Sequence, residues 1–148
     1  MTIYDRYNEM TGLEFLRDLI ARGDASPMGN TMNQRVVVAG DGSAVVEAIP
    51  DARFLNTMQR MHGGFIATLI DTGLGCAVMT KLGRGVGYGT IELKVNFVRK
   101  IDLETGPLRC TANVLHAGRT MLTAECKVAD KAGLLYAHGS GTFLVYPK

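Results

Sequence analysis

The residues from Gly64 to Leu82 form the stretch that most constrains how this chain can fold. They are apolar at nearly every position over the length of a helix, and a Gly-Arg-Gly turn follows them. A helix that is apolar on nearly every face must be surrounded by protein, because none of its faces is suited to water. We therefore predict a central helix over about 64–82 that the rest of the chain encloses.

The overall composition is that of one globular domain. The chain has 148 residues, of which 47% are apolar and 20% are charged, which is enough for one sizeable core. We predict a single domain over 1–148, with an N-terminal helix and loop over 1–32 and a core over 33–148. The first residues lack the pattern of a secretory signal, and no run approaches the roughly 20 apolar residues of a membrane span.

Charge and cysteine usage narrow the possible partners. The formal net charge of +2 is too small to imply a nucleic-acid or membrane-surface partner. The three cysteines lie in apolar segments and show no C-x-x-C spacing, so we expect buried free thiols and no metal site: Cys76, Cys110 and Cys126. We expect a cytoplasmic protein that binds neither nucleic acid nor membrane.

The segments around the central helix predict what encloses it. Thr11 and Glu14 form a capping box at the start of a predicted helix over 11–22. Turn residues separate segments that are rich in β-branched residues or that alternate apolar with polar residues. These segments predict six strands over 35–39, 44–49, 88–100, 108–117, 120–130 and 134–145. Short connections favour antiparallel pairing. The predicted fold class is therefore α+β, with an antiparallel sheet of about six strands wrapped around the helix.

Within the central helix, two glycines and one carboxylate need a physical reason. Gly73 and Gly75 each cost about 1 kcal/mol in a helix interior, so we expect another element to approach closely there. Asp71 lies on an apolar helical face, where burial would raise its pKa unless hydrogen-bond donors compensate. At the helix start, Gly63 and Gly64 offer backbone N–H groups that no turn of helix can satisfy.

Three sequence patterns carry a resemblance to a known family. The segment Asn56-x5-His62-Gly63-Gly64-x6-Asp71 resembles the PaaI-like (phenylacetic-acid-degradation-type) acyl-coenzyme A thioesterases, which have the hotdog fold. The strand over 89–100 is similar to the family's strand that carries Ser or Thr at its start and Phe-x-Arg/Lys near its end. The Gly118-Arg119 turn is similar to the family's Gly-Arg/Lys turn.

The resemblance implies hydrolysis of a small aryl or medium-chain acyl-CoA thioester to free acid and coenzyme A. Asp71 would act as general base or nucleophile, and the N–H of Gly63 or Gly64 would bind the oxyanion. Asn56 and Thr90 would position the water or the thioester, and His62 would serve either as a structural cap or in acid/base chemistry. No metal or redox cofactor is implied, since coenzyme A belongs to the substrate.

A distance argument divides this site between two chains. The helix start and Asp71 lie roughly 10 Å apart at 1.5 Å per residue, too far to act on one carbonyl. The resemblance implies a homodimer in which Asn56, His62 and Gly64 of one chain meet Asp71 and Thr90 of the other, with dimers assembled into a homotetramer. Strand alternation places the Thr90 hydroxyl on the face away from its own helix.

The substrate's two ends have separate candidate residues. Arg99 and Lys100, together with the Gly118-Arg119 turn, are candidates for the phosphates of coenzyme A. The acyl pocket is expected to be lined from two chains, by the first helix and by apolar residues before the central helix: Phe54, Leu55, Met58 and Met61.

Two alternatives to the enzyme remain at this level. One is a non-catalytic hotdog protein that binds acyl-CoA. A hotdog dehydratase or hydratase is the weaker one, because His62 is followed by Gly-Gly and by Asp71 at the thioesterase spacing.

Overall fold

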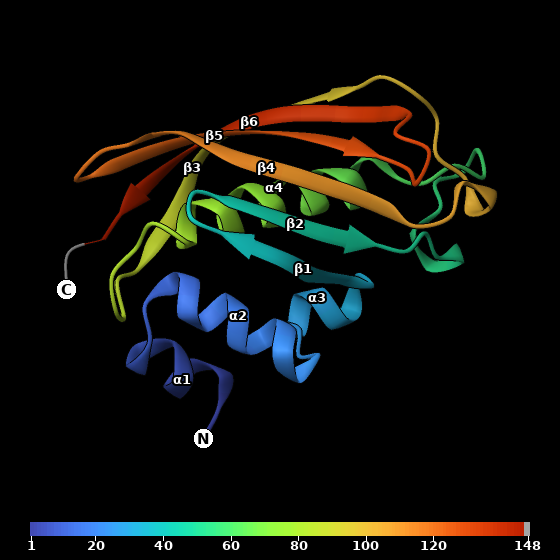
Figure 1. The fold of residues 1–148 in the computed structure, drawn as a ribbon. Coiled ribbons are helices and arrows are strands. Elements are labelled where there is room, and N and C mark those ends of the chain that lie inside the picture. The colour runs from blue at the N-terminus through green and yellow to red at the C-terminus, as the bar shows by residue number, and fades with distance from the viewer. Residues whose placement is uncertain (147–148) are drawn as a thin grey trace.

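The computed structural model describes residues 1–146. A curved sheet of six strands wraps around one long helix, and a group of short helices lies beside the edge strand β1 (Gln34–Gly40) (Figure 1). The predicted α+β architecture is confirmed. Within residues 1–146, no helix is both long and apolar enough to cross a membrane.

The sheet is antiparallel throughout, in the order β1-β2-β4-β5-β6-β3. Its strands lie close to the predicted ranges, and their bounds are β1 Gln34–Gly40, β2 Ser43–Ala48, β3 Tyr88–Phe97, β4 Leu108–Ala117, β5 Met121–Ala129 and β6 Leu135–Val145. Short 3-10 segments lie at Ala52–Phe54 and Leu103–Thr105. β3 is joined only to β6, so it forms one free edge of the sheet.

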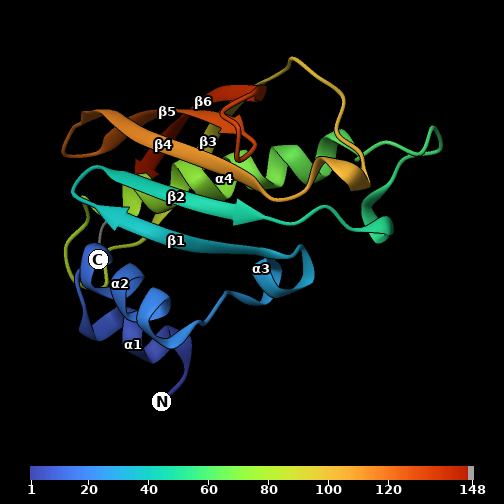
Figure 2. The same ribbon diagram turned by 45° about the vertical axis from the view of Figure 1, so that its right-hand side comes forward.

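The central helix α4 spans Gly63–Met79 and occupies the concave side of the sheet (Figures 1 and 2). It packs against β2, β4, β5 and β6, and the sheet-facing side chains are fully buried: Leu69, Ile70, Leu74, Ala77 and Val78. At about 25 cal/mol per Å² of buried apolar surface, these contacts are the main source of stability for the domain. The predicted enclosed helix is confirmed, ending slightly earlier than expected.

Three short helices precede the sheet. They are α1 Ile3–Glu9, α2 Gly12–Arg22 and α3 Pro27–Thr31. Of these, α2 packs against both β1 and α4, while α1 packs on α2 and α3 packs on β1. The Thr11/Glu14 capping box of α2 is present as predicted. The sequence analysis missed α1 and α3, although Thr2 and Asp5 form a second capping box and Ser26 caps a helix that begins with proline.

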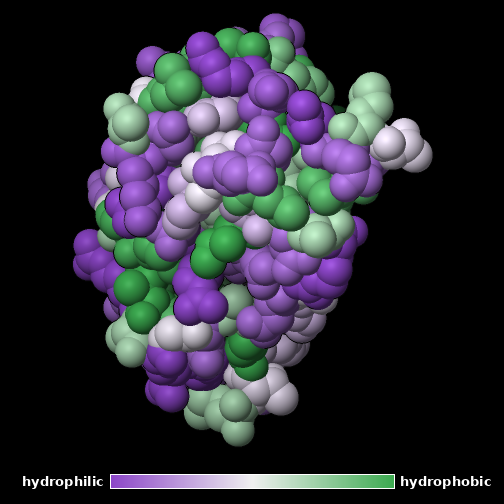
Figure 3. All heavy atoms as spheres, turned by 90° about the vertical axis from the view of Figure 1, so that its right-hand side faces the viewer, coloured by the Kyte–Doolittle hydropathy of each residue, from purple (hydrophilic) through white to green (hydrophobic). Residues whose placement is uncertain are grey.

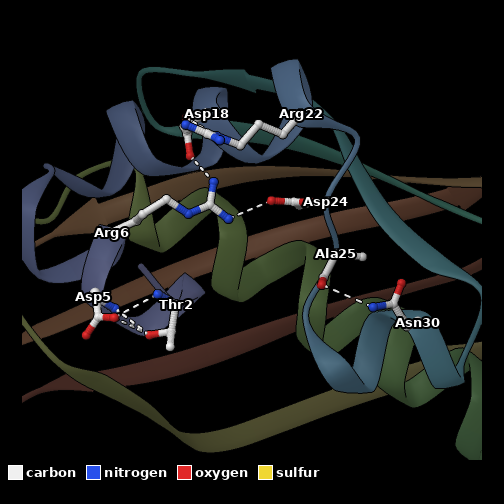
Figure 4. A network of polar contacts seen from close by, with 8 residues as sticks. All are labelled: Thr2, Asp5, Arg6, Asp18, Arg22, Asp24, Ala25 and Asn30. Carbon is white, nitrogen blue, oxygen red and sulfur yellow. Dashed lines mark hydrogen bonds and ion pairs between the residues drawn. The ribbon is translucent and has the colours of Figure 1, made fainter.

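A buried arginine ties α1 to this helical group (Figure 4). The Arg6 side chain is 8% exposed; it forms ion pairs with Asp18 on α2 and, at 2.6 Å, with Asp24 after α2. The hydrogen bond to Asp24 is the largest influence that raises the pKa of Arg6 above its ordinary value, so the guanidinium stays charged despite its burial. Both carboxylates thus fix α1 against α2.

The edge strand β3 departs from the predicted pattern. We expected its apolar alternation to face the core, but within the protomer Ile91 is 53% and Phe97 is 60% exposed. Val95 packs against the core, whereas Leu93 is exposed. The free edge therefore carries apolar side chains that one chain alone does not cover.

Gly73 permits the close approach that was predicted for it. A Cβ atom added to Gly73 would lie 2.5 Å from the Cys110 Sγ atom on β4, which is inside van der Waals contact. We expect Gly73→Ala to lower the free energy of unfolding by about 1–3 kcal/mol, the usual cost of overpacking.

Chemical denaturation with urea measures this effect. Gly83→Ala is the matched control, because its added Cβ would make only an ordinary contact of 3.7 Å with Val86. Equal stability of the two variants would show that β4 yields to the extra methyl group.

Candidate functional site

The start of α4 is capped by the histidine of the His-Gly-Gly motif. His62 is the N-cap residue, and its Nδ1 atom accepts a hydrogen bond of 2.8 Å from the backbone N–H of Gly64. Nδ1 accepts this bond only when it carries no proton. The structure thus places His62 in the capping role that the sequence analysis held open beside acid/base chemistry.

The cap distinguishes between the two candidate oxyanion donors. The N–H of Gly64 is engaged by His62, and the N–H of Phe65 donates to the His62 carbonyl at 2.9 Å. The N–H of Gly63 has no hydrogen-bond partner among residues 1–146. Gly63 therefore presents the free donor at the positive end of the helix dipole, where negative charge is stabilised.

Asn56 shapes the loop that leads to this helix start. Its Oδ1 atom accepts hydrogen bonds from the backbone N–H groups of Met58 at 2.9 Å and Arg60 at 3.1 Å. Its side-chain NH₂ group makes no hydrogen bond within residues 1–146. Asn56 can therefore hold the loop and still donate to a ligand.

A basic groove of about 300 Å³ adjoins Gly63. Three cations border it, namely Arg60, Arg99 and Lys100, and none of them forms an ion pair within the described part of the chain. The Arg99 guanidinium lies 5.8 Å from the centre of the Tyr136 ring, which fixes its position. The structure thus brings the predicted Arg99 and Lys100 together with Gly63, and it adds Arg60, which the sequence analysis missed.

Figure 3 views the molecule from the end where the loops before α4 and after β3 lie. Hydrophilic residues cover much of this face, with hydrophobic residues scattered between them. Such a surface suits a polar, charged ligand portion better than a buried apolar one.

Asp71 and Thr90 meet within one chain. The Thr90 hydroxyl donates a hydrogen bond of 2.8 Å to the Asp71 Oδ1 atom, and Asp71 is half-buried. The expectation that Thr90 points away from its own helix is wrong, because a bulge between Thr90 and Glu92 interrupts the alternation of β3. The hydrogen bond from Thr90 thus fixes the orientation of the Asp71 carboxylate.

The proposed coenzyme A residues fall into two groups. Strand register places the Gly118-Arg119 turn in line with the Thr90 end of β3, through Leu122, Phe143 and their neighbours. Arg99 and Lys100 follow the opposite end of β3. In a single chain, therefore, Arg119 lies on the Asp71 side and the other cations lie on the Gly63 side.

An apolar cavity of about 270 Å³ opens beside Asp71 and Thr90, between α2, β1 and α4. Burial raises the pKa of the Cys76 thiol in its wall to about 12, so this thiol remains neutral. Burial also raises the pKa of Tyr88 well above its ordinary value, and its hydroxyl donates to the Gly75 carbonyl at 2.9 Å. Asp71 and Arg35 are thus the charged residues among those that line the cavity.

The helix α2 borders this cavity through Phe15, Leu16 and Leu19. The other four residues proposed for the acyl pocket do not border it. Phe54, Leu55 and Met61 pack against the hydrophobic core, and Met58 is 73% exposed. These side chains precede α4 and lie at its Gly63 end, so within one chain they are separated from this cavity, and their place in an acyl pocket built from two chains stays a prediction.

Residues 58–137, more than half of the chain, match the thioesterase superfamily. The chain belongs to this superfamily. The fold agrees with that assignment, since the chain superposes on the E. coli PaaI protein from the phenylacetic acid degradation operon with a TM-score of 0.78, over 91% of this chain and 96% of that one, at 21% identity. The predicted hotdog fold is confirmed.

Two further relatives extend the comparison. A conserved protein of Pseudomonas aeruginosa is 34% identical and has a TM-score of 0.77, over 88% of this chain and 98% of its own. Human acyl-coenzyme A thioesterase 13 is 26% identical over 108 residues, 72% of this chain and 76% of that protein. Superfamily membership thus indicates a thioester hydrolase.

The role of His62 can be tested by separating capping from acid/base chemistry. We expect His62→Ala to lower the free energy of unfolding by about 1 kcal/mol, because Gly64 loses its acceptor. His62→Asn should retain that stability, since asparagine is a favoured cap. Urea denaturation measures both. If His62→Asn is as unstable as His62→Ala, the ring contributes packing and not a cap.

Proposed function

We propose that this protein hydrolyses acyl-CoA thioesters of small aryl or medium-chain acids to the free acid and coenzyme A. The observation that carries the proposal is the combination of three environments on one protein. Gly63 has a free N–H at the start of α4, a basic groove adjoins it, and the Asp71 carboxylate, held by Thr90, lines an apolar cavity. A thioester between an acyl group and a phosphate-bearing thiol needs these three environments together.

The two halves of the proposed site must come from two chains. Gly63 and Asp71 are eight residues apart on α4, about 12 Å along its axis. A single thioester carbonyl cannot contact both. We therefore propose a homodimer in which Gly63 of one subunit meets Asp71 of the partner subunit.

The free edge of β3 supports that arrangement. Its unpaired backbone groups can extend the sheet to a second copy, and its exposed apolar side chains would be covered there. In antiparallel pairing of two β3 strands, the Phe97 end of one strand lies beside the Thr90 end of the other. Phe97 lies next to Gly63, since a Cβ added to Gly63 would be 3.2 Å from its ring, and Thr90 is bonded to Asp71.

Each group then has a chemical task. Asp71 removes a proton from water as the water oxygen attacks the thioester carbon, and the Gly63 N–H stabilises the negative charge that forms on the carbonyl oxygen. The C–S bond breaks, and the proton on Asp71 passes to the leaving thiolate. If Asp71 attacks directly, a mixed anhydride forms and water hydrolyses it in a second step. Thr90 orients the carboxylate in either route.

Replacement of the carboxylate tests the enzyme against a non-catalytic binder. We expect Asp71→Asn to lower kcat for thiol release by about 100-fold or more, because the base is lost while shape and hydrogen-bonding capacity are kept. Thiol release from a panel of acyl-CoAs measures this effect. Wild-type protein that binds acyl-CoAs but releases no thiol from any of them would favour the binder.

A mixed dimer tests the division of the site. Gly63→Pro removes the free N–H and keeps the helix start, because proline is favoured at the first helical position and the extended backbone of His62 accommodates it. Gly63→Ala is the control for the added Cβ, which would lie 3.2 Å from the Phe97 ring in both variants. A dimer of one Gly63→Pro chain and one Asp71→Asn chain should retain about half of the wild-type kcat. Complete loss would mean that each chain builds its own site.

The basic groove can be tested with a truncated thiol. We expect the double variant Arg99→Ala and Lys100→Ala to raise KM for acyl-CoA about tenfold, since two charged donors to phosphate are lost. The N-acetylcysteamine thioester of the same acid lacks phosphates and should be hydrolysed equally well by the variant and the wild type. Lys127→Ala, on the outer face of β5, is the control. An equal loss on both thioesters would place these residues outside phosphate binding.

A further inference from the structure

Gln34 is a buried polar side chain in the wall of the cavity beside Asp71. It is the first residue of β1 and is 3% exposed. Its Nε2 atom donates a hydrogen bond of 3.3 Å to the Phe65 carbonyl in the first turn of α4. That carbonyl can only accept, so the amide nitrogen faces α4 and the amide oxygen faces the other way.

The amide oxygen of Gln34 has no partner among residues 1–146. In the same part of the chain, every fully occluded side-chain nitrogen or oxygen has a partner, so the oxygen borders open space. The space that Gln34 borders is the cavity beside Asp71. An acceptor that no protein group satisfies is open to a hydrogen-bond donor of a ligand that displaces water from the cavity.

The position of Gln34 fits one part of the substrate. Phe65 and Asp71 are six residues apart on α4, about 9 Å along its axis. This separation is comparable to the length of a six-carbon acyl chain with a terminal hydroxyl group. An acyl group attacked near Asp71 could thus bring a hydrogen-bond donor at its far end to Gln34.

We propose that Gln34 determines acyl specificity, its amide oxygen accepting a hydrogen bond from a hydroxyl group at the far end of an acyl chain that lies in this cavity. The proposal rests on the proposed thioesterase function and adds the chemical class of the acyl group. An acyl group with an apolar end leaves the buried acceptor unpaired, and such a site discriminates against a ligand that lacks the donor.

Matched substrates isolate this hydrogen bond. Hexanoyl-CoA and 6-hydroxyhexanoyl-CoA differ only in the distal hydroxyl. We expect wild type to have the higher kcat/KM for the hydroxylated substrate, and Gln34→Met to lower that value about 3- to 10-fold while leaving hexanoyl-CoA unchanged or improved. A merely structural role of Gln34 would lower both values by the same factor.

Two more variants keep the comparison decisive. Gln34→Asn keeps the amide but withdraws it by one methylene, so it should also lose the preference for the hydroxylated substrate. It provides the test if Gln34→Met does not fold. Gln59→Met removes an exposed glutamine outside the cavity and should leave the ratio between the two substrates unchanged. An unchanged ratio in both Gln34 variants would overturn the proposal.

Binding separates failure of this inference from failure of the thioesterase function. Non-hydrolysable thioether analogues of the two substrates can be titrated calorimetrically into wild type and Gln34→Met. If no acyl-CoA is hydrolysed, the thioesterase function fails, while an affinity ratio that changes on substitution still supports Gln34. If the substrates are hydrolysed but neither ratio changes, the role of Gln34 fails alone.

Discussion

Burial of α4 is the constraint on which the rest of the structure depends. A helix with apolar side chains on nearly all sides cannot lie at a surface, and the sheet meets this requirement by curving around it. Small residues determine how closely the sheet approaches α4, as the proximity of Gly73 to Cys110 on β4 shows. The sheet does not close fully, so the face of α4 that carries Asp71 faces α2 and β1 instead.

Because α4 is enclosed incompletely, there is room for the candidate site. Where α2 covers α4, the packing leaves an apolar cavity, and the buried Arg6 pairs hold the covering helices in place (Figure 4). Asp71, the charged residue of the otherwise apolar α4, lines this cavity. At the other end of the same helix, capping by His62 consumes one N–H group and leaves Gly63 free. One helix thus carries both groups of the proposed mechanism, at points too far apart to act on one carbonyl within a chain.

In the proposed dimer, the edge strand β3 brings these two groups together. Ile91 and Phe97 are exposed although they continue the apolar alternation of β3. In a dimer through this edge, the same strand would cover its apolar side chains and bring the helix start of one chain to the carboxylate of the other. Stability of the assembly and completion of the proposed site would then depend on the same contact.

The sequence by itself determined the elements of the core and the positions of the candidate site residues along the chain. Periodicity and turn residues are local properties, so they located six strands, α2 and α4, and the spacing from Asn56 to Asp71 identified the helix start and its carboxylate. Even so, α1 and α3 were missed because each is too short to show a periodic pattern, although their caps were readable.

Only the tertiary structure decided which groups meet. Strand order, with β3 at an edge, depends on pairings between distant segments. The bulge that turns Thr90 toward Asp71 breaks the alternation from which its direction was predicted. A single hydrogen bond engages the N–H of Gly64 and not that of Gly63, and the cavity that Gln34 borders lies between elements that are distant in the sequence. These features arise from contacts across the fold, which local sequence patterns do not encode.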